Sequence, residues 1–173
     1  MKNIVIIFFF LLCVSKLFGQ ANDSLVLFTK SIEWSLFKGI PDSDSLGARI
    51  STTIHLEIRR VNVWNGVLHF KAHALMNPSK SWVTSGYADL YTLQHEQTHF
   101  NLTEICARGL QTELNQMKLK SKKTTLIQAT LTKWQHKLEV LQKQYDLETK
   151  GGNDHVAQNT WNEKIIAELN ATD

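Results

Sequence analysis

The periodicity of the apolar residues changes near residue 86, and this change most limits the folds that the chain can adopt. Before it, Ile54, Leu56 and Ile58 alternate with polar residues, which is typical of a half-buried strand. After it, the segment from Tyr87 to about Met117 has helical periodicity and contains no proline. Strands that are followed by helices indicate the α+β class. We therefore predict one domain with an N-terminal antiparallel β-meander and a helical C-terminal half.

Four short runs before residue 86 are the expected strands: residues 24–30, 50–58, 61–64 and 67–75. The last two flank Asn65-Gly66, which is a strong signal for a hairpin turn. In the second arm of this hairpin, alternate residues from Leu68 to Ala74 are apolar and should face the core. The pattern therefore predicts a two-stranded antiparallel hairpin within the sheet.

Three helices are expected in the second half, over residues 87–117, from Thr124 onward and over residues 156–169. The second helix carries a narrow apolar seam that should pack on another helix, formed by Ile127, Leu131, Trp134, Leu138, Leu141 and Tyr145. Gly151-Gly152 separates it from the third helix. The lysines at positions 118, 120, 122 and 123 crowd the first connection. We interpret this basic cluster as part of a solvated loop and not as a site for a binding partner.

The first 19 of the 173 residues have the composition of a secretory signal peptide. Lys2 precedes the apolar run from Ile4 to Val14, which is too short to span a bilayer, and small residues follow at Gly19 and Ala21. Cleavage after either residue is compatible with the pattern. An uncleaved anchor, or lipidation at Cys13, is less compatible with it. We predict a secreted or periplasmic protein whose residues 20–173 form a single domain.

Removal of the signal peptide changes the overall composition of the chain. The formal charge falls from +3 to +1, because Lys2 and Lys16 are lost, and Cys106 becomes the only cysteine. Such a small net charge is not typical of a nucleic-acid-binding protein. One cysteine cannot form an internal disulfide. The mature domain is expected to have no nucleic-acid partner and no stable membrane span.

The five residues from His95 to His99 form an HExxH motif inside the first predicted helix. Residues four apart lie on one face of a helix, so His95 and His99 can bind one Zn²⁺ ion. Glu96 lies about 100° further round the helix, where it can act as general base toward a zinc-activated water. The sequence therefore predicts a zincin-like site. The alternative is a surface helix with two unrelated histidines.

The third zinc ligand is not defined by the motif. Glu104 lies about 180° round the helix from His95, so it is disfavoured. His55, His69 and His73 fall on the polar face of the predicted sheet, although His73 could face the cleft, and Glu148 ends the second helix near the Gly-Gly break. His155 follows that break. We predict His155 as the third ligand, together with His95 and His99.

Short motifs along nearly the whole mature chain resemble those of one bacterial family. They are Trp34-x-x-Phe37-x-Gly39, Ser81-Trp82-Val83, Leu93-x-His95-Glu96-Gln97-x-His99-Phe100, Ala107-Arg108, and Tyr145-Asp146-x-x-Thr149 with Gln158 and Trp161. In this order they resemble the DUF922 family of predicted secreted Zn-dependent proteases. The resemblance implies a zinc protease and a histidine at the position of Gly151. Because this chain has glycine there, His155 would have to substitute through the flexible Gly-Gly break.

Two functions fit these observations. The first is a secreted or periplasmic zinc metallopeptidase-like hydrolase that acts on a peptide or protein, with Glu96 as its base and an edge strand to hold the substrate. The second is a non-catalytic exported zinc-binding or envelope-associated domain, which the glycine at position 151 favours. A carboxylate or histidine that completes the metal site would favour the enzyme. Tyr145 could stabilise an oxyanion, but its place in the helix seam favours a structural role.

Overall fold

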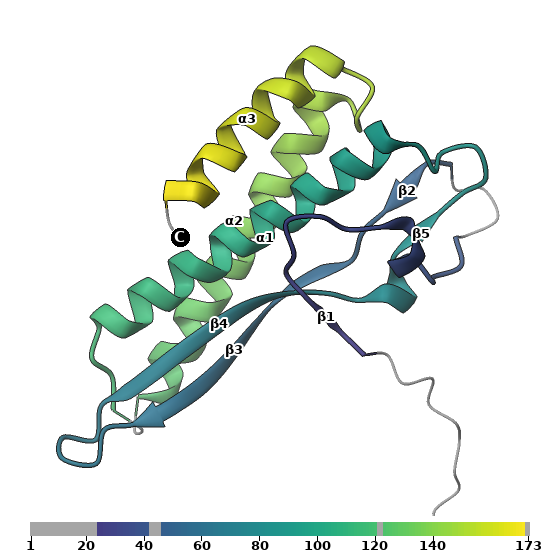
Figure 1. Cartoon of the computed structure of the whole chain (residues 1–173). Helices are drawn as coiled ribbons and strands as arrows, with labels where there is room; N and C mark the ends of the chain where they lie inside the picture. Colours follow the sequence, from purple (N-terminus) through teal and green to yellow (C-terminus); the bar gives the residue numbers. More distant parts are fainter. Residues whose placement is uncertain (1–23, 42–45, 121–122, 172–173) are drawn as a thin grey trace, which may run out of the picture.

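The computed structural model describes residues 24–41, 46–120 and 123–171. Antiparallel strands come first and three helices follow, which confirms the predicted α+β class (Figure 1). The predicted signal peptide, residues 1–19, lies outside the described residues. Within the described ranges, no helix combines the length and the apolar character needed to cross a membrane.

The strands form two small sheets and not the predicted meander. β1 (Val26–Leu27), β4 (Leu68–Met76) and β3 (Thr52–Val61) make a sheet in the order β1-β4-β3. β2 (Ala48–Arg49) pairs with β5 (Trp82–Val83) in a separate antiparallel pair. β3 occupies one edge of β4, and β1 pairs with the opposite edge of β4 instead of the outer edge of β3. The predicted meander order is therefore wrong.

The β3–β4 hairpin forms around Asn65-Gly66 as predicted, but its first arm is one continuous strand. The expected run 61–64 is not a separate strand, because β3 extends to Val61 and the connection begins at Asn62. The register of the pairing shifts between Ile58 and Arg60. This bulge ends the simple alternation of the first arm, which is why the sequence suggested two runs.

The helices are α1 (Leu90–Gln116), α2 (Thr124–Thr149) and α3 (His155–Ala171), close to the predicted ranges. The Asp89 side chain accepts a hydrogen bond of 2.8 Å from the Thr92 amide and caps α1. α2 ends where Lys150 adopts a left-handed conformation, and the Gly151-Gly152 turn follows with positive φ at both residues. The chain can therefore reverse direction within five residues.

α1 is the central element, and it packs on β4, α2 and α3 (Figure 1). The inward residues of β4 are buried as predicted, and the seam of α2 packs on the same core. Two backbone amides of β4 that β1 does not reach find hydrogen-bond acceptors on α1. The Ala72 amide donates to Gln111 Oε1, and the Phe70 amide donates to Asn115 Oδ1. α1 is thus held between the sheet and the other two helices, and this packing fixes the position of the HExxH residues.

Candidate metal centre

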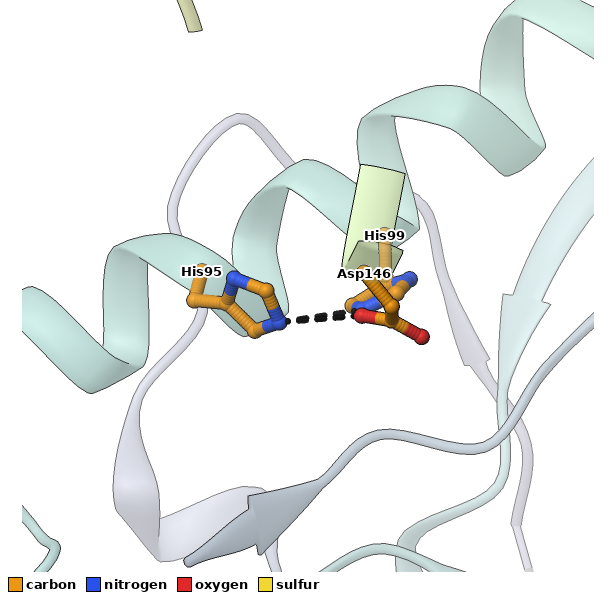
Figure 2. A group of neighbouring side chains, drawn as sticks. All are labelled: His95, His99 and Asp146. Carbon is orange, nitrogen blue, oxygen red and sulfur yellow. Dashed lines mark hydrogen bonds and ion pairs between the residues drawn. The ribbon is translucent and has the colours of Figure 1, made fainter. Parts of the chain in front are cut away.

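Three ligand-type side chains meet where the first half of α1 lies beside the end of α2 (Figure 2). His95 and His99 are one turn apart on α1, and Asp146 comes from α2. Asp146 Oδ1 lies 3.2 Å from His95 Nε2 and 2.9 Å from His99 Nε2. The two Nε2 atoms are 3.3 Å apart. The group could therefore hold one metal ion.

The dimensions of this triangle agree with a tetrahedral metal site. Ligand atoms at about 2.0–2.1 Å from zinc are about 3.3 Å from one another in a tetrahedron. The three observed separations lie between 2.9 and 3.3 Å. Little rearrangement would be needed for His95, His99 and Asp146 to share one ion. Three protein ligands are also the number that leaves a tetrahedral site open for water or substrate.

The tautomer of His95 is fixed by Gln158 of α3. The Gln158 amide nitrogen donates to the Tyr91 carbonyl, so its oxygen faces His95 Nδ1 at 3.0 Å and accepts a hydrogen bond from it. In neutral His95, Nε2 then carries a lone pair and points at the Asp146 carboxylate. Two acceptors this close require a cation or a proton between them. This is the arrangement expected behind a metal-binding histidine.

Buried aromatic rings hold the two imidazoles in place. Tyr145 is fully buried and stacks on His95 at 4.7 Å between ring centroids, and its edge contacts His99 at 5.0 Å. Trp161 packs on the other side of Tyr145. Burial raises the pKa of the Tyr145 hydroxyl, so this group stays neutral at physiological pH. The Tyr145 ring therefore packs in the core, as its seam position predicted.

The charge of the site is concentrated on Asp146. Partial burial opposes ionisation of its carboxyl, but the contacts with the His95 and His99 imidazoles outweigh that effect, so its pKa lies well below the usual range. The carboxylate is half exposed and has contacts from both imidazoles. It is therefore an anionic oxygen donor over the whole physiological pH range.

Glu96 is buried beside the histidines and has one clear partner. Its Oε2 accepts a hydrogen bond of 2.6 Å from the Ile50 amide, just after β2. Burial raises the pKa of its carboxyl above the ordinary range, although the nearby His99 and His95 and this hydrogen bond act in the opposite direction. A carboxylate with a raised pKa, next to a metal site, is suited to accept and return a proton.

The site opens into a cleft of about 970 Å³ between α1, the end of α2 and the β2–β5 pair. Gly152 forms part of its wall, where a Cβ atom would lie 3.3 Å from the His95 ring. Gly152 has a positive φ of 88°, so both its backbone and the space at His95 favour glycine. The turn after α2 thus lies close to the candidate metal group, which is formed by His95, His99 and Asp146. Gly152 places no side chain between this turn and the His95 ring.

The predicted ligands His95 and His99 lie together, whereas His155 is not part of the group. The His155 ring stacks on Tyr91 at 3.9 Å and lines the cleft. Gly151 has open space around it, so no side chain fills the position of the expected family histidine. The other acids and histidines that were considered have different partners: Glu104 with Arg108, Glu148 with Trp161, and His73 with Glu57.

Asp146 is the residue that the sequence reasoning missed as a ligand, although it belongs to the Tyr145-Asp146 motif. Tyr145 ends the apolar seam of α2, and α2 returns along α1 after a short connection. A residue next to Tyr145 therefore lies beside the first half of α1. The combination of seam, return direction and acidic side chain was the available signal.

Comparisons with family models, curated proteins and solved structures give no match for this chain. The resemblance to the DUF922 motifs therefore stays a prediction from sequence.

Proposed function

We propose that this chain is an exported zinc-dependent hydrolase of the metallopeptidase type, with His95, His99 and Asp146 as zinc ligands. The observation that carries the proposal is the triangle of two Nε2 atoms and one carboxylate oxygen, with edges of 2.9–3.3 Å, in the wall of an open cleft. The HExxH sequence, its position on α1 and the motif resemblance support a zincin-like site. Asp146 takes the place that we first predicted for His155.

Glu96 is the general base in this proposal. Bound zinc would supply a Lewis acid that lowers the pKa of a water ligand and polarises a substrate carbonyl. Glu96 follows His95 directly on α1, and its carboxylate is held by the Ile50 amide. That hydrogen bond fixes one carboxylate oxygen and leaves the other for a proton. Gln158 orients His95, and Asp146 adds the negative charge that a divalent cation favours.

The proposed substrate is an extended peptide that pairs with β2. Gly47 directs its backbone toward Thr84, whereas the Ile50 amide points to Glu96 on α1. Backbone groups alternate in direction along a strand, so Ala48 presents its amide and carbonyl on the same side as the Ile50 amide. Ala48 also lines the cleft. A peptide paired with Ala48 would lie next to the metal group.

A non-catalytic zinc-binding domain is the second function, and one contact favours it. The buried Glu96 carboxylate bonds to the Ile50 amide at 2.6 Å, so Glu96 also joins α1 to the β2–β3 segment. A residue used only in this way would be structural. In that case zinc would stabilise an exported or envelope-associated domain that binds a peptide or protein without cleaving it.

The test compares single variants of the chain purified from a host that exports it. We expect one zinc per chain, loss of that zinc in Asp146→Ala as in His95→Ala, and its retention in the matched variant His155→Ala. Glu96→Gln should keep zinc and lose hydrolysis of a quenched fluorescent peptide library. If Asp146→Ala keeps full zinc affinity, the ligand assignment is wrong. If the zinc-loaded chain cleaves no peptide, the non-catalytic function is favoured.

The export step is proposed separately. The intact mass of the protein recovered outside the cytoplasm should lack either the first 19 or the first 21 residues. A full-length mass at that location would favour the uncleaved anchor.

A further inference from the structure

The β3–β4 hairpin projects at the end of the molecule that is far from the start of α1 (Figure 1), and its tip exposes apolar side chains. Val63 is 89% exposed and Trp64 is 94% exposed. The turn itself is well defined, because Asn62 Oδ1 accepts hydrogen bonds from the Trp64 and Asn65 amides, and Asn65 Oδ1 accepts one from the Val67 amide. The hairpin therefore presents a bulky aromatic side chain to solvent on an ordered turn.

Basic side chains surround this tip. The connection after α1 runs along the base of the hairpin, where the Leu68 amide donates to the Leu119 carbonyl and Val67 pairs with Lys120. Four exposed cations consequently gather at this end, namely Arg60, Lys118, Lys120 and Lys123. The sequence contains no Asp or Glu between Glu57 and Asp89 or between Glu113 and Glu139. The two stretches of chain that form this end therefore contribute basic but no acidic side chains.

We propose that this end of the molecule docks on a membrane surface that contains anionic lipids. Tryptophan is enriched at the headgroup level of membranes, because its ring combines an apolar body with a polar N–H group. Lysine and arginine beside it are attracted by the negative lipid headgroups. Val63 and Trp64 would enter the interface, and Arg60, Lys118, Lys120 and Lys123 would contact the phosphates around them.

Other occupants fit this end less well. Two apolar side chains on a narrow turn offer much less area than the roughly 800 Å² per partner of a typical protein interface. A nucleic acid would be attracted by the lysines, but it would not favour burial of Val63. Lys118, Lys120 and Lys123, which the sequence alone suggested lie in a solvated loop, thus acquire a proposed partner through the pairing of Lys120 with Val67 at the hairpin.

Docking in this way would keep the metal cleft away from the lipid. His95 lies near the start of α1, about 30 Å along the helix axis from the other end of α1. The hairpin tip lies at that other end (Figure 1). The membrane proposal does not depend on zinc or on hydrolysis. Either one can fail while the other stands.

The experiment measures sedimentation of the purified, exported protein with vesicles of phosphatidylcholine, with and without phosphatidylglycerol. We expect binding only to the anionic vesicles, a decrease with added salt, and a blue shift of the tryptophan fluorescence. Each Lys→Gln change at Lys118 or Lys120 should weaken binding about fivefold. The double variant Val63→Ser/Trp64→Ser should weaken it at least about tenfold. The matched control is Val156→Ser, because Val156 is 78% exposed at the far end of the molecule.

Three results would overturn the proposal. One is equal binding to neutral and anionic vesicles, and another is unchanged binding of the Val63→Ser/Trp64→Ser variant. The third is a dimer in sedimentation velocity that dissociates in Trp64→Ser, since this would assign the tip to a second copy of the chain. Because all variants share the same N-terminus, residues 1–23 cannot produce a difference among them.

Discussion

At the scale of single residues, Gln158 is as informative as the histidines. It is fully buried on α3, and it can accept from His95 Nδ1 only because its amide nitrogen is used by the Tyr91 carbonyl. The result is a His95 imidazole whose Nε2 is ready for a metal ion before any ion arrives. Helix packing alone would favour an apolar residue at this position, because an apolar side chain fills the same space without needing hydrogen-bond partners. The buried glutamine is therefore better explained by its hydrogen bond to His95.

We predict that Gln158→Leu weakens zinc binding about 10- to 100-fold, because the His95 ring loses the acceptor that fixes its tautomer. Competition with a zinc chelator measures the affinity, and thermal unfolding of the metal-free variant measures any loss of folding separately. Gln144→Leu is the matched control, because Gln144 is exposed on α2, away from the histidines, and bonds to Glu148. An unchanged affinity in a folded Gln158→Leu variant would contradict the proposed role.

At the scale of elements, the sequence predicted the three helices and the hairpin because each of them has a local signal. The residues of α1 have helical periodicity without proline, the Gly-Gly pair follows α2, and Asn65-Gly66 lies at the hairpin turn. The strand order was not predictable in the same way. β1 has only two residues, and it pairs with the free edge of β4 and not with the free edge of β3. Such a choice depends on tertiary contacts and not on a local pattern.

The same reasoning explains the partial prediction of the metal site. His95 and His99 belong to one helix, so their spacing alone brings them together. Asp146 is about 50 residues away in sequence, and only the antiparallel return of α2 brings it close. Contacts between α1 and α2 follow that return in order, from Trp134 with Glu113, through Gln142 with the His99 carbonyl, to Asp146 with His95. Extrapolation along the seam would have reached Asp146.

The α1–α2 pair should be sensitive to acid through Glu113. Its carboxylate accepts hydrogen bonds from Lys133 and from the Trp134 indole, and these bonds hold its pKa below the ordinary value. A lowered pKa in the folded state stabilises the fold above about pH 4.3, the value expected in the unfolded chain, and this contribution is lost as the pH falls further. We predict that Glu113→Gln costs about 1 kcal/mol at neutral pH.

The measurement for Glu113 is urea unfolding at several pH values. The difference between the original chain and Glu113→Gln should shrink below about pH 4.3. Glu139→Gln serves as control, since Glu139 is well exposed and makes only long contacts, within α2. A difference that stays constant down to the lowest pH would mean that the Glu113 carboxylate is not the source of the stability.

At the scale of the whole molecule, the candidate metal group adds a link between helices that already contact one another through apolar packing and hydrogen bonds. His95 and His99 belong to α1, Asp146 to α2, and Gln158, which orients His95, to α3. An ion bound there would be lost if any of the three helices moved away. Metal binding should therefore be linked to global unfolding and not to a local change at the cleft.

Cys106 is a natural reporter of that global opening. It is fully buried on α1 in the main core, and burial raises the pKa of its thiol to about 11, so the native protein should not react with a thiol reagent at neutral pH. Zinc at about 100 times its dissociation constant should lower the unfolded population, and hence the labelling rate in mild denaturant, about 100-fold. Glu96→Gln should show the same protection, whereas Asp146→Ala should show none. Equal labelling rates with and without zinc in the original chain would show that zinc binding does not stabilise the fold. A second thiol that reacts at once would report Cys13 and thus an uncleaved N-terminus.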